Sequence, residues 1–173
     1  MGKKHIGANE RLWIAGEIQR LLVIAKDVSH GGSPWAYNLI RNVYLWYWTA
    51  DGIDAKGELK RDLFKKDTDF IRHTPDALKA LKDRRKVTHE HAVPRKVLLQ
   101  YLKDRNYHSP AEIKLFLDRF CFGVIIDKER DTPKLKGHSA SMPTPFSETS
   151  NPLERYELSP KIDVLEPKNQ RSD

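Results

Sequence analysis

Three Ser-Pro or Thr-Pro dipeptides, each followed by apolar residues at helical spacing, constrain the fold more than any other feature of the sequence. They are Ser33-Pro34, Thr74-Pro75 and Ser109-Pro110. Ser and Thr are favoured at the N-cap of a helix, and Pro is favoured at the first helical position because its fixed φ suits the first turn. Each dipeptide therefore predicts the start of a helix.

Apolar spacing extends these starts into a set of predicted helices. Residues that recur at intervals of three and four predict helices over about 9–30, 34–50, 75–82, 94–104 and 110–120. The β-branched run 122–126 predicts a strand, and Val87-Thr88 predicts a shorter one. We therefore expect a mainly α fold of five to seven helices, with at most one small two-stranded β element near residues 89–91. The expected organisation is a single domain over residues 1–160 and a charged, flexible tail over 161–173.

The charge balance favours a polyanionic partner. The 173 residues include 31 Lys and Arg against 24 Asp and Glu, so the formal net charge at pH 7 is +7. A charge of this sign attracts DNA or RNA, and it leaves an acidic protein partner open as well. No apolar run reaches the length of a membrane span, so we expect no membrane partner. The single cysteine, Cys121, excludes an internal disulfide, which favours a cytoplasmic location.

Three of the four tryptophans lie in the predicted helix 34–50, at positions 35, 46 and 48. Dense aromatic residues can stack on nucleobases. Here Leu39, Ile40, Val43 and Leu45 are interleaved with them, which is the pattern of helix packing. We expect these aromatic side chains to belong to the core.

The residues that carry chemistry are concentrated in the segment Thr88-His89-Glu90-His91-Ala92-Val93-Pro94-Arg95. Pro94 and the apolar pattern after it place a helix start directly behind the two histidines. Free amides and the positive end of the helix dipole favour a phosphate or carboxylate at such a position, and they disfavour a protonated imidazole. A neutral imidazole is what a general base or a metal ligand requires.

Cations flank this segment on both sides. Lys86 precedes it at the end of a basic run over residues 79–86, and Arg95 and Lys96 follow it. Cationic side chains neutralise phosphates when nucleic acid binds. We therefore expect Lys86, Arg95 and Lys96 to position a phosphate beside the histidines.

The pentapeptide Glu90-His91-Ala92-Val93-Pro94 resembles the first half of the HNH, or ββα-metal, nuclease motif. In that motif an acidic residue or a histidine precedes the catalytic histidine, and an aliphatic residue and a proline follow. The resemblance implies that His91 is the base that activates water and that Glu90 is a ligand of a divalent metal ion. It also makes His89 a candidate second ligand, with Mg, Mn or Zn as the metal.

The second half of that motif lacks an equally close counterpart. The chain has no CxxC pair, and the nearest Asn and His downstream are Asn106 and His108. A second source of ligands is open: if the two predicted strands pair, they would bring Asp127 and Glu129 beside the histidines.

Two functions from different classes follow from these observations. The first is a small metal-dependent nuclease that hydrolyses phosphodiester bonds of DNA or RNA. The alternative is a non-catalytic basic protein that binds nucleic acid or a protein partner, in which the two histidines are structural.

Overall fold

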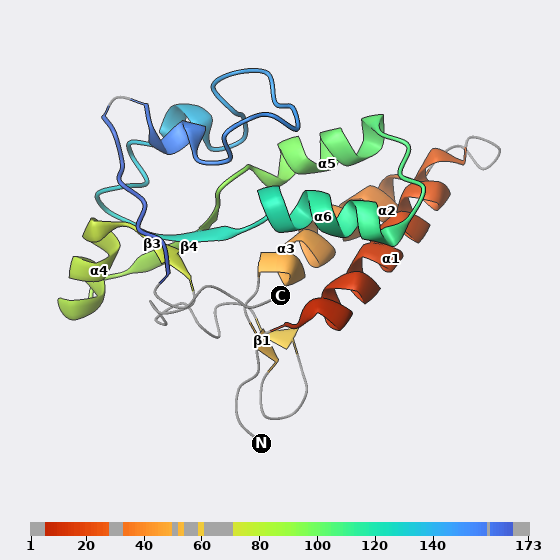
Figure 1. Cartoon of the computed structure of the whole chain (residues 1–173). Coiled ribbons are helices and arrows are strands. Elements are labelled where there is room, and N and C mark those ends of the chain that lie inside the picture. Colours follow the sequence, from red (N-terminus) through yellow and green to blue (C-terminus); the bar gives the residue numbers. More distant parts are fainter. Residues whose placement is uncertain are drawn as a thin grey trace.

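A computed structural model gives the fold of residues 6–27, 33–49, 71–158 and 160–167, together with the backbone of 52–53 and 59–60 (Figure 1). The helices are α1 (Ala8–Lys26), α2 (Pro34–Leu39), the π-helix η2 (Ile40–Tyr44), α3 (Leu45–Thr49), α4 (Pro75–Lys82), α5 (Arg95–Asp104) and α6 (Pro110–Phe120). The strands are β1 (Gly52–Ile53), β2 (Leu59–Lys60), β3 (Arg72–His73), β4 (Val87–His91) and β5 (Gly123–Asp127). Two short 3₁₀ turns follow, η3 (Lys136–His138) and η4 (Glu154–Tyr156).

The three helix starts predicted from Ser-Pro and Thr-Pro are confirmed. Helices α2, α4 and α6 begin at the prolines of these dipeptides. The Thr74 hydroxyl accepts a hydrogen bond from the amide of Ala77 at 3.0 Å, and Ser109 accepts one from the amide of Glu112 at 3.3 Å. The Glu112 carboxylate in turn accepts from the amide of His108 at 3.0 Å. Both N-caps therefore satisfy amides that a helix leaves without partners.

Helices α1, α2, α3, α5 and α6 form one layer at one end of the molecule, whereas α4 lies at the other end, against the sheet (Figure 1). Segments α2, η2 and α3 follow one another without a break, so the described residues contain five helical rods, within the expected five to seven. Helix α1 packs along α6, and their contact buries Ile14, Ile18 and Leu117. Burying an aliphatic side chain of this size stabilises a fold by about 1.5–3 kcal/mol, so this interface anchors the layer.

The sheet beside this layer has three strands in the order β3-β5-β4, and the expectation of at most two strands was wrong. Strand β5 pairs in parallel with β3 and in antiparallel fashion with β4. A separate antiparallel pair joins β1 to β2. The fold is therefore a mixed α/β arrangement in which helices and a mixed sheet share one body.

The third strand, β3, forms for a physical reason that could not be seen in the sequence pattern. All five residues of β5 are buried, so this strand is central and has two edges to pair. Strand β3 contains only Arg72 and His73, which is too short for an alternating pattern. Its pairing depends on the free edge of β5, which lies more than 50 residues away.

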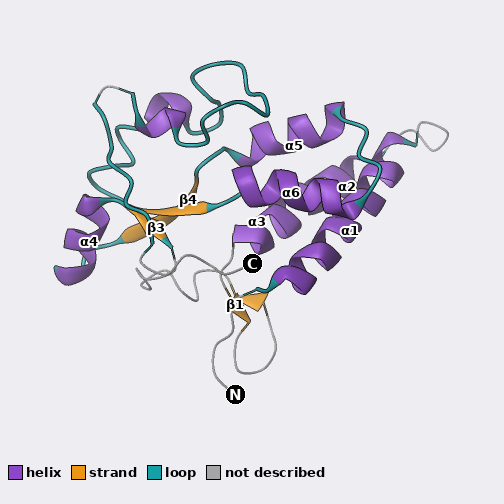
Figure 2. Cartoon of the chain, in the orientation of Figure 1, coloured by secondary structure: helices purple, strands orange, loops and turns teal. Residues whose placement is uncertain are grey.

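The two faces of the sheet are covered by different parts of the chain. On one face, Ile125 packs with Ile71 and with Ala77 of α4. On the other face, Val124 and Ile126 pack against the segment after β5, which is mostly loop (Figure 2). That segment contributes a second small core of Leu135, Tyr156 and Ile162.

The first residues of the predicted tail contact this sheet. Ile162 is buried, and Leu165 exchanges two backbone hydrogen bonds with His73, at 2.8 and 3.3 Å. Residues 168–173 of the predicted tail lie outside the described part of the chain. Within the described residues, every helix is too short or too polar to cross a bilayer.

Candidate functional site

The C-terminal end of β4 opens onto a pocket of about 330 Å³, here called the His-Glu-His pocket. Strand β4 is an edge strand, so its last residues have no strand on one side, although the side chains of His89 and His91 are buried there. The lining residues are Arg41, Asn42, Trp46, His89, Glu90, His91, Pro94, Arg95, Lys96, Ser139 and Ala140. They come from η2, α3, β4, the start of α5 and the loop after η3.

The two histidines lie on a strand, which is longer than the strand predicted from Val87-Thr88. Strand β4 extends to His91, and the amide of Ala92 continues the pairing by donating to the carbonyl of Phe122 at 2.9 Å. Helix α5 begins at Arg95, with Pro94 as its N-cap. Because side chains alternate along a strand, His89 and His91 share one face and Glu90 points to the other.

The His91 ring is held by the helix that precedes the sheet. Its Nε2 lies 3.3 Å from the carbonyl oxygen of Leu45 and 3.2 Å from the hydroxyl of Thr49. A carbonyl oxygen only accepts hydrogen bonds, so Nε2 carries the proton in the neutral ring and Nδ1 keeps a lone pair. Burial, helped by the nearby His89 and Arg95, lowers the pKa of His91 to about 3. His91 is therefore neutral at pH 7.

His89 is positioned by a glycine on the neighbouring strand. A Cβ at Gly123 would lie 1.6 Å from Nε2 of His89, so the ring occupies the space that any side chain there would need. The rings of His89 and His91 lie 5.8 Å apart between centroids. Gly123 was not among the predicted site residues, although a Gly at the start of a buried strand is a recognised sign of close approach.

Trp46 forms the wall between these histidines and a cation. Its ring meets His91 edge-on, with centroids 4.7 Å apart, and the Arg95 guanidinium carbon lies 4.6 Å from its ring centroid. Arg95 also donates to the carbonyl of Arg41 at 2.9 Å. Trp46 is thus half-buried at the site, whereas Trp48 is a core residue as expected and Trp35 is exposed.

Glu90 forms an ion pair with an arginine that is remote in sequence. Nη2 of Arg155 lies 2.7 Å from Oε1 of Glu90, and the Arg155 side chain is fully buried. Nη1 of Arg155 donates to the carbonyl of His138 at 2.9 Å, which ties the C-terminal segment to β4. Sequence reasoning missed Arg155 because 65 residues separate it from Glu90.

The predicted phosphate-binding residues separate into two groups. Arg95 and Lys96 line the pocket. Lys86 is exposed and precedes the first residue of β4, at the strand end opposite His91. At about 3.3 Å per residue, Lys86 is roughly 16 Å along the strand from His91. The structure therefore does not bring Lys86 to the pocket.

The residues proposed to complete a metal site are also elsewhere. Strands β4 and β5 do pair, but their register places Asp127 opposite Val87, about 13 Å along the strand from His91. This register separates Asp127 from His91, whereas His89 faces Ile125, two residues from Asp127. Glu129 lies beyond the end of β5 and is exposed. Asn106 and His108 are exposed in the connection between α5 and α6, outside the pocket lining.

Asp127 has a structural role in this register. It forms an ion pair with Arg85 and accepts hydrogen bonds from the amides of Glu129 at 2.8 Å and Arg130 at 3.3 Å. Burial acts to raise the pKa of Asp127, but the Arg85 guanidinium and these amides outweigh it and lower the pKa below its usual value. The carboxylate thus closes the turn after β5.

The described residues fit an anion better than a divalent cation. Within the described part of the chain, no group of three or more His, Cys, Asp or Glu side chains could hold a metal ion. Glu90, the predicted metal ligand, already neutralises a buried guanidinium. The other charged side chains at the pocket are Arg41, Arg95 and Lys96. A second positive charge beside Glu90 would be repelled by all of these cations.

Comparison with known proteins gives no family assignment. No protein-family description, no curated protein and no solved structure matches this chain. The class that the fold and the pocket define is therefore a basic α/β protein with an arginine-rich pocket at a sheet edge.

Proposed function

We propose that the chain binds nucleic acid and that a backbone phosphodiester occupies the His-Glu-His pocket. The observation that carries this proposal is the charge of the pocket. Three cations line it, a fourth contacts its carboxylate, and its buried imidazole His91 is neutral. Such a site attracts an anionic group. Among the described lining residues the one carboxylate is that of Glu90, whose charge is neutralised by Arg155.

Arg95 is held in place before any ligand arrives. The Trp46 ring and the carbonyl of Arg41 fix its guanidinium, so little side-chain entropy is lost when an anion binds. Lys96 is exposed on the first turn of α5. An anion at this turn also lies near the positive end of the helix dipole.

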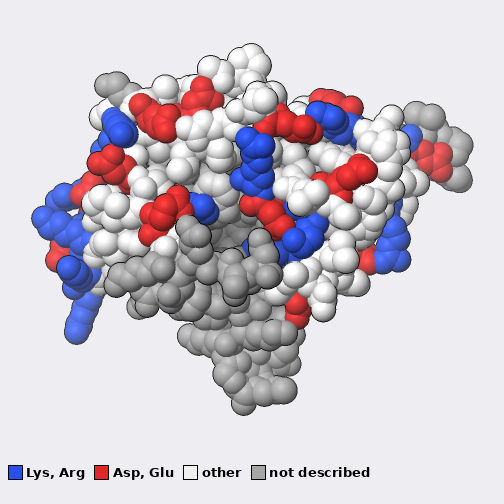
Figure 3. Space-filling view, in the orientation of Figure 1, with Lys and Arg blue, Asp and Glu red and all other residues white. Residues whose placement is uncertain are grey.

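Charge outside the pocket supports a polyanion over a small phosphate compound. The formal net charge is +7. Lys79, Lys82, Arg84 and Lys86 are all exposed on and after α4. Figure 3 shows Lys and Arg side chains gathered at the end of the molecule where α4 lies. Extended basic surface of this kind steers nucleic acid toward a protein. A cytoplasmic location, where DNA and RNA are available, is part of the proposal.

The test is a titration of fluorescently labelled single-stranded DNA, duplex DNA and RNA, followed by anisotropy at several salt concentrations. We expect binding that weakens as salt rises, because counterions are released on binding. Arg95→Ala should lower the affinity by about 10- to 150-fold, since a hydrogen bond to a charged group contributes about 1.5–3 kcal/mol. Lys161→Gln is the matched control, because this exposed lysine is outside the pocket lining. Equal affinity of wild type and Arg95→Ala would reject the pocket as the binding site.

Hydrolysis of the bound phosphodiester is the second candidate, favoured by the orientation of His91. Its Nε2 faces Leu45 and Thr49, so Nδ1 is left as a proton acceptor. This candidate ranks second because a pKa of about 3 makes a weak base at pH 7. The Mg, Mn or Zn ion implied by the HNH resemblance belongs to this candidate alone. Incubation of the same nucleic acids with each metal or with EDTA, for wild type and His91→Ala, tests it: cleavage lost in the variant would make the protein a nuclease.

A further inference from the structure

A second cavity adjoins the His-Glu-His pocket along helix α5. Its volume is about 350 Å³, and it is called here the α5 cavity. Lys96 and Ala140 line both spaces, so the two are neighbours at the start of α5. The residues of the α5 cavity that matter below are Val97, Gln100, Tyr101, Asp104, Met142 and Phe146.

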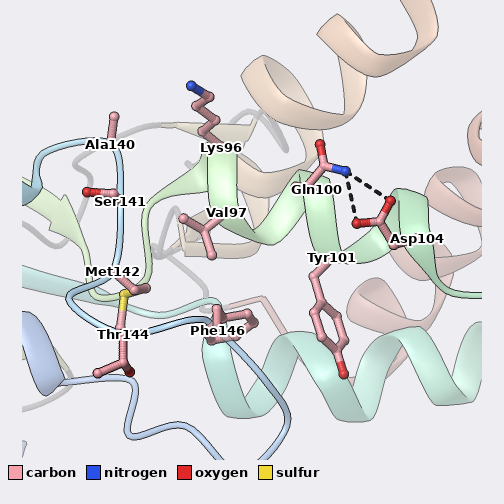
Figure 4. A pocket seen from close by; sticks show the side chains of 10 residues that line it. All are labelled: Lys96, Val97, Gln100, Tyr101, Asp104, Ala140, Ser141, Met142, Thr144 and Phe146. Carbon is pink, nitrogen blue, oxygen red and sulfur yellow. Dashed lines mark hydrogen bonds between the residues drawn. The ribbon is translucent and has the colours of Figure 1, made fainter.

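The lining changes from charged to apolar along this path. Successive turns of α5 present Val97, then Tyr101, on the side that faces Met142 and Phe146 (Figure 4). The ring of Tyr101 stacks on Phe116 with a centroid separation of 4.9 Å and meets Phe146 edge-on at 5.4 Å. The aromatic side of the cavity is therefore rigid and pre-formed.

The rim of the α5 cavity is polar, and among the described residues that line it the shared Lys96 is the one cation. Gln100 donates to both carboxylate oxygens of Asp104 at 2.9 Å (Figure 4). The Gln100 amide oxygen and the Asp104 carboxylate are left as hydrogen-bond acceptors. A carboxylate here disfavours a phosphate, so an anionic group is directed to the other end of the path.

The opposite wall of the α5 cavity, residues 140–146, is anchored at both ends. The carbonyl of His138 accepts from buried Arg155 at 2.9 Å, just before this wall. Within it, Thr144 donates to the Glu154 carboxylate at 2.8 and 2.9 Å. Phe146 closes the wall against Phe120 at a centroid distance of 5.0 Å. The cavity is thus a built feature of the fold.

We infer that the α5 cavity holds a nucleobase of a single-stranded nucleic acid whose phosphate occupies the His-Glu-His pocket. This inference rests on the proposed function. A nucleotide joins an anionic phosphate to a flat apolar ring with polar edges. The two neighbouring spaces offer cations in one and an aromatic lining with acceptors at its rim in the other. Bases stacked within a duplex cannot enter such a cavity, so single strands are the substrate class.

The experiment compares two labelled probes of equal length and charge, a single-stranded oligonucleotide and an abasic strand with the same sugar-phosphate backbone. Wild type should bind the oligonucleotide about tenfold more tightly than the abasic strand, because a stacked base adds affinity that the backbone lacks. Ser141→Trp and Gln100→Trp fill the cavity from opposite walls at exposed positions. Each should lower affinity for the oligonucleotide to the abasic level. Ser141→Trp, at a residue with no assigned contact to the base, should leave abasic binding unchanged. Thr149→Trp is the control for added bulk, at an exposed position outside the lining.

The possible outcomes distinguish a failure of this inference from a failure of the proposed function on which it rests. If wild type binds both probes equally and neither filling variant has an effect, the α5 cavity does not hold a base, while the phosphate site stands. Binding of neither probe overturns the proposed function and the inference with it. A circular dichroism spectrum and melting temperature like those of wild type show that each variant is folded.

Discussion

The buried guanidinium of Arg155 and the carboxylate of Glu90 form an ion pair, with Nη2 and Oε1 separated by 2.7 Å. The two partners differ in exposure: the Arg155 side chain is 0 % exposed and that of Glu90 is 29 % exposed. When one partner is removed, the charge of the other is left unpaired. An unpaired charge lowers the stability of the fold most where no water can solvate it. The pair should therefore respond unequally to its two truncations.

Glu90→Ala should destabilise the fold by about 3–5 kcal/mol, because it leaves the buried guanidinium without its counter-charge. Arg155→Met should cost less, since the Glu90 carboxylate that remains can take up water. Urea denaturation of both variants and of the double variant measures the difference. A larger loss for Arg155→Met than for Glu90→Ala would contradict this account of the pair.

Gly123→Ala should destabilise the fold by about 1–3 kcal/mol or more, because the added methyl group overlaps the His89 ring. The matched control is Gly137→Ala, where a Cβ would meet nothing within 4 Å. That control should change stability by less than about 0.5 kcal/mol. Combining Gly123→Ala with His89→Ala should recover part of the loss in thermal or urea denaturation. If Gly123→Ala and Gly137→Ala behave alike, His89 does not lie against Gly123.

Stability should fall as the pH drops from about 6.5, and His91 should be a main cause. The pKa of His91 is lowered to about 3 in the folded protein, so between these values the unfolded chain binds the proton more readily. Each pH unit in this window then costs up to about 1.4 kcal/mol for this one group. The lowered pKa of Asp127 acts in the same direction, but only below about pH 4.

Urea denaturation of wild type and His91→Asn between pH 4.5 and 7 isolates this contribution. The variant should lose less stability than wild type on acidification. His108→Asn, at an exposed histidine, provides the control and should follow the wild-type curve. Parallel curves for wild type and His91→Asn would mean that His91 does not stay neutral in the folded protein.

Asp127→Asn should lower the free energy of unfolding by about 1–3 kcal/mol, because it weakens the Arg85 ion pair and the turn after β5. Its affinity for nucleic acid should stay within about twofold of wild type, since Asp127 is remote from the pocket. The exposed Glu129→Gln serves as control and should change neither property. A large loss of binding by folded Asp127→Asn would place Asp127 in the binding site after all.

Local chemistry made several elements predictable. Thr74 and Ser109 bond to amides three residues ahead of them, and the fixed φ of a proline acts on its own turn. The strand at β5 was predictable because three consecutive β-branched residues favour extended backbone. Arg95 and Lys96 line the same pocket as His91 because only a few residues separate them.

The pairing partners could not be read in the same way. The third strand, β3, has two residues and no period, and it forms because β5 has a free edge. The register of β4 against β5 moved Asp127 away from His91, although the pairing of these strands was expected. In the sequence, nothing distinguishes Arg155 from any other arginine in a short polar turn. Its burial beside Glu90 is a result of the tertiary fold.

One physical cause separates the features that the sequence predicted from those that depend on the tertiary structure. N-caps, proline starts and apolar spacing act over three or four residues. The helices and strand β5 are therefore determined by interactions between residues that are close in sequence. The environment of the site depends on contacts between residues that are remote in sequence: His89 with Gly123, Glu90 with Arg155 and His91 with Leu45. Such contacts exist only once the helical layer, the sheet and the C-terminal segment have packed together, and that packing surrounds His89, Glu90 and His91 with arginine and lysine side chains.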